Sequence, residues 1–171
     1  MKKYEFTGET KEIRLLFRTA TLHRIRATVA FGIVEVGDLG GWIEKEENLS
    51  HEGKAWVCGD AKVCGDAKVW GNAKVWGNAE VCGDAEVFSA SHVLVIGAIG
   101  SRNDFTTFYR DKDNEITVKC GCFLGKIDRF LEKVTQTHGD SKYALVYRAA
   151  VEVAKLQIDL SGEAPKDADE E

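Results

Sequence analysis

The sequence has no excess of positive charge, no long apolar run and a single proline among its 171 residues. A formal net charge of -5 argues against broad attraction to nucleic acid or anionic lipid, because an acidic surface repels both polyanions. No stretch is long and apolar enough to span a bilayer, and the opening MKKYEFTGETKEI lacks the apolar centre of a secretory signal. We therefore expect a cytoplasmic protein with neither a membrane nor a nucleic-acid partner.

The five cysteines form no recognisable metal-binding set. Cys120 and Cys122 make one CxC pair, whereas structural zinc sites usually combine two such pairs. We predict that no metal is bound and that these two residues are small core residues. Cys64 and Cys82 can come within disulfide reach if neighbouring repeats stack, but a reducing compartment predicts that they remain thiols.

A six-residue word is written five times from Gly59 to Phe88, as GDAKVCGDAKVWGNAKVWGNAEVCGDAEVF. Alanine and valine stand two places apart in each word, so both point to one face of a short strand, while Lys or Glu points to the other. Gly-Asp or Gly-Asn then supplies turn chemistry. A strict period of six does not suit a helix of 3.6 residues per turn, so the repeat predicts a β-solenoid.

Three words per turn of chain would place each residue over the residue eighteen positions later. Lys62 then lies over Glu80 and Lys68 over Glu86, which pairs opposite charges on neighbouring strands. The residue after each valine is apolar and should point outward, and a column of exposed tryptophan is unusual for a monomer. Unless other parts of the chain cover these positions, we predict a homo-oligomer, a trimer or dimer, with an interface at Trp70, Trp76 and Phe88.

The C-terminal third changes character after the repeat. DFTTFYR and EITVKCGCF flank DKDN and predict a β-hairpin, and two later segments carry their apolar residues at helical spacing on either side of Gly139. The expected organisation is N-terminal strands at 1–33, a repeat solenoid at 34–98, an α/β cap at 99–160 and a disordered acidic tail at 161–171.

The repeat resembles the hexapeptide-repeat, left-handed parallel β-helix family, in which an aliphatic residue is followed four places later by a small one, as Val57 is by Ala61. The segments GDLGGWIEKEENLS, IGSRNDFTTFYR, CGCFLGKIDRFLEKV and THGDSKYALVYRAAVEVAKL are also similar to a family of small proteins encoded by bacteriophages and prophages. The resemblance implies a mainly β fold, a left-handed parallel β-helix with a C-terminal β-hairpin plus two-helix cap, in the host cytoplasm. Members are often labelled transferases, but the resemblance supplies no catalytic residues.

The densest polar cluster is SRND, where the repeat gives way to the C-terminal part. Arg102 can hold a phosphate or carboxylate with two N–H groups, and junctions between structural units favour pockets. Alternatively, the neighbouring polar residues shape a turn and Arg102 pairs with an acid. The predicted ligand-binding residues are Ser101, Arg102, Asn103, Asp104, Thr106 and Arg110.

Two functional hypotheses follow. The first is a non-enzymatic binding module of a phage or prophage, without a cofactor, that presents its C-terminal part to a host protein or a small phosphorylated ligand and can serve against host defence. The second is an acyltransferase that uses a coenzyme A thioester at a subunit interface, as the resemblance to hexapeptide-repeat enzymes implies, with a histidine as general base. Its candidate catalytic residues are His51, His92 and His138; His23 offers no motif either.

Overall fold

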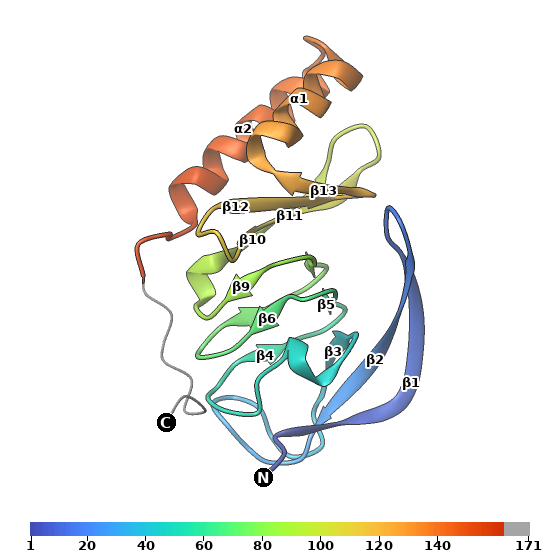
Figure 1. Ribbon diagram of the computed structural model, residues 1–171, viewed down its shortest axis with the longest axis vertical. Coiled ribbons are helices and arrows are strands. Elements are labelled where there is room, and N and C mark those ends of the chain that lie inside the picture. The colour runs from blue at the N-terminus through green and yellow to red at the C-terminus, as the bar shows by residue number, and fades with distance from the viewer. Residues whose placement is uncertain (163–171) are drawn as a thin grey trace.

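The computed structural model describes residues 1–162, so residues 163–171 of the predicted acidic tail lie outside the described residues. The chain begins with two long antiparallel strands, β1 (Tyr4–Arg14) and β2 (Thr19–Ala27). A four-residue turn joins them, in which the Leu15 amide donates to the Arg18 carbonyl at 2.8 Å. Strand β2 then pairs antiparallel with β3 (Leu39–Ile43). The hairpin runs along one side of the molecule and its tip points toward the C-terminal sheet (Figure 1).

After a short 3-10 turn, η1 (Glu46–Asn48), the repeat segment forms strands of only two residues each. These are β4 (Trp56–Val57), β5 (Lys62–Val63), β6 (Lys68–Val69), β7 (Lys74–Val75), β8 (Glu80–Val81) and β9 (Glu86–Val87). They pair in parallel with partners eighteen residues later, as Lys62 does with Glu80 and Lys68 with Glu86, which confirms the predicted stacking. The alanines and valines of the words are at most 1% exposed, so they fill the interior as predicted.

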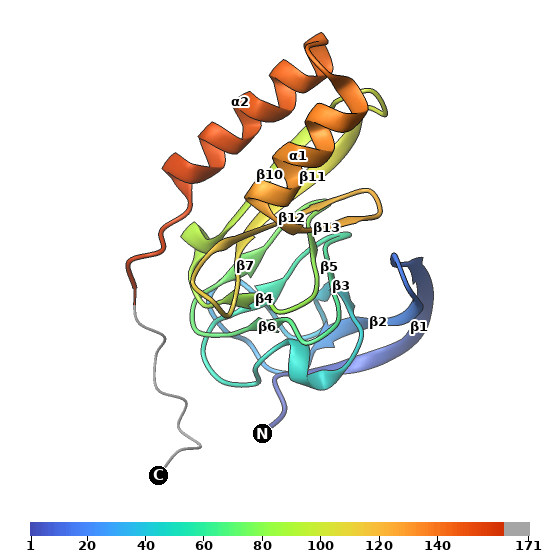
Figure 2. The same cartoon turned by 45° about the horizontal axis from the view of Figure 1, so that its top comes forward.

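The C-terminal part follows a second 3-10 turn, η2 (Ala90–His92). Its antiparallel sheet contains β10 (Val93–Ile99), β11 (Asp104–Arg110), β12 (Ile116–Cys120) and β13 (Phe123–Lys126). Two antiparallel helices, α1 (Ile127–His138) and α2 (Lys142–Gln157), pack against it (Figure 2). The predicted hairpin and helices are therefore present, and Gly139 ends α1 with a φ of 57°, a left-handed conformation that favours glycine.

The predicted fold class, a mainly β left-handed parallel β-helix, is wrong. The described residues form several small sheets: a mixed five-stranded sheet in the order β1-β2-β3-β5-β8, the four-stranded antiparallel sheet, and the separate parallel pairs β4-β7 and β6-β9. Each word supplies only two residues of strand, whereas the long strands pair antiparallel. Val93, which keeps the valine register of the repeat, starts β10 and pairs with Tyr109 instead. The expected hairpin cap is likewise a four-stranded sheet.

The N-terminal hairpin covers one outer face of the repeat segment. Cys64 and Cys82 are fully buried there in a small cluster with Ala20, Leu22 and Trp42. The prediction that these cysteines remain thiols is wrong, because they form a disulfide with their Cα atoms 4.6 Å apart. The i, i+18 stacking places the two side chains in one column, and the covering strands leave them facing each other. Both cysteines belong to the lining of a cavity described below.

Candidate functional site

The turn Cys120–Gly121–Cys122 between β12 and β13 separates two cavities. The upper cavity, about 190 Å³, lies between this turn, the Ser101–Asp104 turn and helix α1. The lower cavity, about 480 Å³, lies between this turn, the tip of the β1–β2 hairpin at residues 15–18 and the turns of the repeat segment. Both are within or near the size range of small-molecule sites, so their chemistry decides what they can hold.

The Ser101–Asp104 turn connects β10 to β11 and is exposed along its whole length. Two residues give the turn its shape: Asn103 has a φ of 48° and its amide donates to the Gly100 carbonyl, and the Asp104 carboxylate accepts from the Phe105 amide at 2.7 Å. Asparagine and aspartate are favoured in such turns because their side chains bond the local backbone. Three of the four predicted residues, Ser101, Arg102 and Asp104, line the upper cavity.

Two cations stand at this cavity without partners. Within residues 1–162, neither Arg102 nor Lys133 forms an ion pair. The Arg102 guanidinium crosses the turn of β12–β13, since its Nη1 atom lies 3.2 Å from the place that a Cβ on Gly121 would take. Lys133 and Thr137 line the cavity from one face of α1, because they are four residues apart on the helix. The cavity therefore offers two cations and hydroxyl groups, together with the Asp104 carboxylate, which accepts from the Phe105 amide.

Tyr147 of α2 also lines the upper cavity. Burial and the nearby Cys120 thiol raise the pKa of Tyr147 to about 12, so its phenol remains protonated at neutral pH. The His138 ring stacks on Tyr147 with centroids 5.7 Å apart and also lines the cavity. Of the three histidines proposed as catalytic, this is the one that borders a cavity described here.

The other two candidate bases have structural roles. The His51 ring stacks on Tyr4, and its Nδ1 accepts a hydrogen bond from the Lys3 amide at 3.0 Å. His92 is buried, and its Nδ1 accepts from the Phe88 amide at 3.2 Å. Burial lowers the pKa of both imidazoles, which keeps them in the neutral form that accepts these bonds. His23 stacks on Phe6.

The remaining predicted ligand residues lie elsewhere. Thr106 is buried and its hydroxyl donates to the Cys120 sulfur at 3.4 Å. Arg110 stands at the opposite end of β11, where its Nε donates to Asn114, its Nη1 donates to the Glu86 carbonyl and its guanidinium lies over the Phe88 ring. The sequence grouped these residues with the SRND turn because they are near in sequence, but a strand of seven residues separates its two ends.

The three aromatic residues predicted at an interface differ in exposure. Phe88 is only 9% exposed, because it packs inside the chain against His92, Arg110 and the half-buried Trp70. Trp76 is 52% exposed. A contact between subunits at this column therefore remains a prediction that depends on Trp76.

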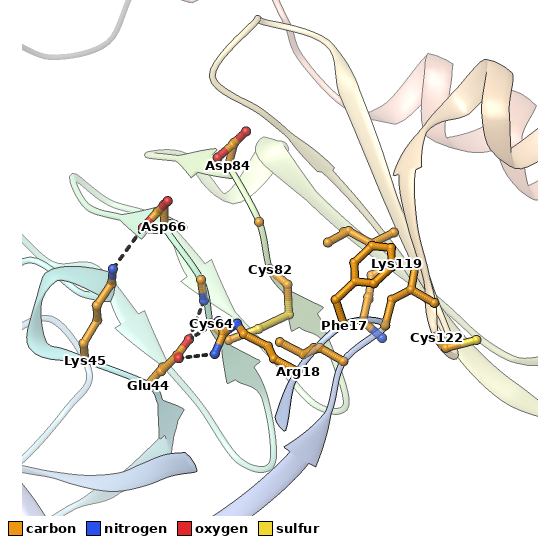
Figure 3. Close-up of a pocket in the computed structure, with 15 residues that line it drawn as sticks. Phe17, Arg18, Glu44, Lys45, Cys64, Asp66, Cys82, Asp84, Lys119 and Cys122 are labelled. Carbon is orange, nitrogen blue, oxygen red and sulfur yellow. Dashed lines mark hydrogen bonds and ion pairs between the residues drawn. A yellow bond between two sulfur atoms is a disulfide. The ribbon is translucent and has the colours of Figure 1, made fainter. Parts of the chain in front are cut away.

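The lower cavity also contains charged residues, and Figure 3 shows two of their ion pairs, Arg18 with Glu44 and Lys45 with Asp66. Arg18 binds Glu44 through both guanidinium nitrogens at 2.5 and 2.9 Å, and Lys45 pairs with Asp66 at 3.0 Å. Lys119 is buried and pairs with Glu80 at 3.0 Å, while Asp84 pairs with Lys112 at 3.2 Å. The Glu44 carboxylate also accepts from the Gly65 amide, and its hydrogen bond from Arg18 holds the pKa of Glu44 below its ordinary value.

Sequence reasoning missed the residues that helices and the hairpin contribute to the two cavities. These are chiefly Lys133, Thr137 and Tyr147 in the upper cavity and Leu15, Leu16, Phe17 and Leu124 in the lower one. The four-residue spacing of Lys133 and Thr137 was a usable signal. The segment LLF at residues 15–17 was a second usable signal, because it is an apolar run at a position where a hairpin turn is ordinarily polar.

No protein-family model matches the chain, and no curated protein sequence matches it either. In the part of the chain that the structure describes, no helix is both long and apolar enough to cross a membrane. Over the same residues, no group of three or more His, Cys, Asp and Glu side chains is arranged to hold a metal ion. The functional argument therefore depends on the geometry of the two cavities.

Proposed function

We propose that this protein is a non-enzymatic binding module that holds a small phosphorylated ligand in the upper cavity. The observation that carries the proposal is that Arg102 and Lys133, which form no ion pair within residues 1–162, line one cavity. An unpaired cation gains more from an anionic ligand than a paired one, because no existing contact has to be broken.

The groups around the cavity suit a phosphoryl group. The guanidinium of Arg102 can donate two parallel hydrogen bonds to phosphate oxygens, and Lys133 adds a mobile point charge. The hydroxyls of Ser101 and Thr137 can complete the set of donors, and the protonated Tyr147 phenol can donate one more. Because the cations are exposed, we expect a dissociation constant on the order of 0.1–1 mM for a small sugar phosphate.

The viral and oligomeric parts of the proposal have separate support. The resemblance to phage and prophage proteins supports an origin in a virus, where a ligand-binding module or a contact with a host protein can counter host defence. The exposed Trp76 supports self-association, because a large aromatic side chain is stabilised when a second subunit covers it. The acyltransferase alternative has less support, since His51 and His92 already use Nδ1 to accept backbone hydrogen bonds.

Calorimetric titration with ribose 5-phosphate, and with ribose as its uncharged counterpart, tests the proposal. We expect heat from ribose 5-phosphate alone, and an increase in the dissociation constant of about tenfold in Arg102→Ala, the loss of one charge-assisted contact. Arg129→Ala is the matched control, because Arg129, which lies on α1, is an exposed arginine like Arg102 but does not line the cavity. Equal weakening in both variants, or no heat with the wild type, would overturn the proposal. Binding of acetyl coenzyme A that His138→Ala abolishes would favour the acyltransferase.

A further inference from the structure

The lower cavity differs from the upper one in that each charged side chain in its lining has a partner of opposite charge. The buried Cys64–Cys82 disulfide belongs to the lining of this cavity and to a cluster with Trp42 and Leu22. Leu15 and Leu124 line the walls, and Leu124 is 39% exposed. The cavity therefore presents apolar side chains beside its paired charges.

The mouth of this cavity exposes two large apolar side chains. Leu16 and Phe17 at the hairpin tip are 59% and 94% exposed. Figure 3 shows the Phe17 ring near Lys119, on the side of the cavity opposite to Glu44 and Lys45. Exposed apolar groups gathered beside a cavity mark a place where burial of a partner would be favourable. An aromatic ring at the entrance also suits a ligand that contains a ring.

The ion pairs reduce the attraction of this cavity for a charged ligand. The six charged residues that line the cavity each have a partner of opposite charge: Arg18, Glu44, Lys45, Asp66, Asp84 and Lys119. An anion or cation entering here would gain little, because the charge that it meets is already neutralised by a partner. An uncharged apolar molecule displaces only water and leaves the pairs intact.

We propose that the lower cavity is a second binding site, which takes an uncharged, largely apolar molecule with an aromatic ring. A volume of about 480 Å³ accommodates a two-ring compound with space for a substituent. The site is independent of the phosphorylated ligand, because the Cys120–Gly121–Cys122 turn stands between the two cavities.

The test uses the fluorescent probe N-phenyl-1-naphthylamine, which is uncharged, and its close relative 8-anilino-1-naphthalenesulfonate, which carries a negative charge. Both are titrated into the full chain with Arg102→Ala, so that the upper cavity does not attract the sulfonate. We expect the uncharged probe to bind at least about fivefold more tightly than the charged one. Tighter binding of the charged probe would overturn the proposal.

Location is tested by Leu124→Ser and Phe17→Ser, with Leu145→Ser as the control. Leu145 is 60% exposed on α2 and does not line either cavity, so it reports adsorption to any apolar surface. We expect a rise in the dissociation constant of about fivefold or more in the first two variants and less than twofold in the control. Equal losses of affinity in all three variants would show that the probe only adsorbs to exposed apolar surface.

Sedimentation of each variant tests whether a second copy of the chain fills the cavity. If Phe17→Ser converts a dimer into monomers, a second copy fills the cavity and the proposal is wrong.

Discussion

The two cavities on either side of the Cys120–Gly121–Cys122 turn both contain cations, yet they suit different ligands. In the lower cavity Arg18 is held by Glu44 through two hydrogen bonds, whereas in the upper cavity Arg102 has no carboxylate partner among residues 1–162. A paired arginine contributes little attraction to a ligand, because its charge is already neutralised and its donors are in use. The comparison teaches that the pairing of a cation decides its availability, which a count of charged residues does not reveal.

Removal of the disulfide should damage the lower cavity alone. In Cys64→Ala with Cys82→Ala, the cross-link between residues 18 apart is lost, and we expect the free energy of unfolding to fall by about 3 kcal/mol. Urea unfolding gives this value. Binding of the uncharged probe should weaken, while the affinity for ribose 5-phosphate should stay within twofold.

Cys58→Ala is the control for that experiment. Cys58 is a half-buried, free cysteine in the same repeat, so its loss should cost less than about 1 kcal/mol. A double variant as stable as Cys58→Ala would contradict the structural role of the disulfide.

Gly100→Ala should damage the upper cavity alone. Gly100 has a φ of 77°, and a Cβ there would collide with the Tyr147 hydroxyl, so the turn or the tyrosine must shift. We expect a loss of about 2 kcal/mol in unfolding free energy from backbone strain and overpacking together. The affinity for ribose 5-phosphate should fall about tenfold, with binding of the uncharged probe unchanged.

Gly77→Ala is the control that separates backbone strain from steric clash. Gly77 has a φ of 60°, but no atom lies within 4 Å of the place that a Cβ would take. It should cost about 1 kcal/mol. If Gly100→Ala costs no more than Gly77→Ala and keeps full affinity for ribose 5-phosphate, Tyr147 does not support the upper cavity as described.

Glu44→Gln should make the lower cavity resemble the upper one. The change removes the negative partner of Arg18, so we expect weak binding of ribose 5-phosphate at the lower cavity and a stability loss of about 1 kcal/mol at neutral pH.

The pKa of Glu44 is lowered in the folded state, chiefly by its hydrogen bond from Arg18. The contribution of Glu44 to the free energy of unfolding is therefore complete above the ordinary pKa of 4.5, and it is lost as the pH falls through the lower pKa of the folded state. Urea unfolding of the wild type and of Glu44→Gln from pH 7 to pH 3 measures this pH dependence.

Glu47→Gln is a suitable control, because Glu47 is exposed and forms no ion pair in the described part of the chain. The stability difference between wild type and Glu44→Gln should shrink below pH 4.5, whereas the small difference for Glu47→Gln should vary less. A constant difference across this range would show that the Arg18–Glu44 pair does not depend on the charge of Glu44.

Local features of the fold were predictable from the sequence. The spacing of alanine and valine predicted which side chains are buried, and the charge switch predicted that Lys62 pairs with Glu80. The fold class was not predictable in the same way. A repeat fixes which residues stack, but the N-terminal hairpin joins β5 and β8 into a mixed sheet, and Val93 leaves the repeat for an antiparallel partner. Both pairings depend on strands outside the repeat, which the repeat itself does not predict.

The residues of the candidate site could likewise be predicted only in part from the sequence. The turn chemistry of Ser101–Asp104 could be identified from its residues, and Arg102 stood out as the group able to hold an anion. The spacing of Lys133 and Thr137 indicates only that they share a helix face, and that this face and Tyr147 border the cavity depends on the packing of α1 and α2 on the sheet. Arg110 does not line this cavity, because β11 carries it to the end of the strand opposite to the Ser101–Asp104 turn, which nearness in sequence does not reveal.

A titration with ribose 5-phosphate followed by the backbone amide NMR signals tests the central claim most directly, because it reports where a phosphorylated molecule binds. We predict that saturable shifts are concentrated in the Ser101–Asp104 turn and at Lys133 to His138, with little change around Arg18, Lys45 and Lys119. Shifts centred on the lower cavity, or spread evenly over exposed lysines, would contradict the claim that unpaired cations define the ligand site.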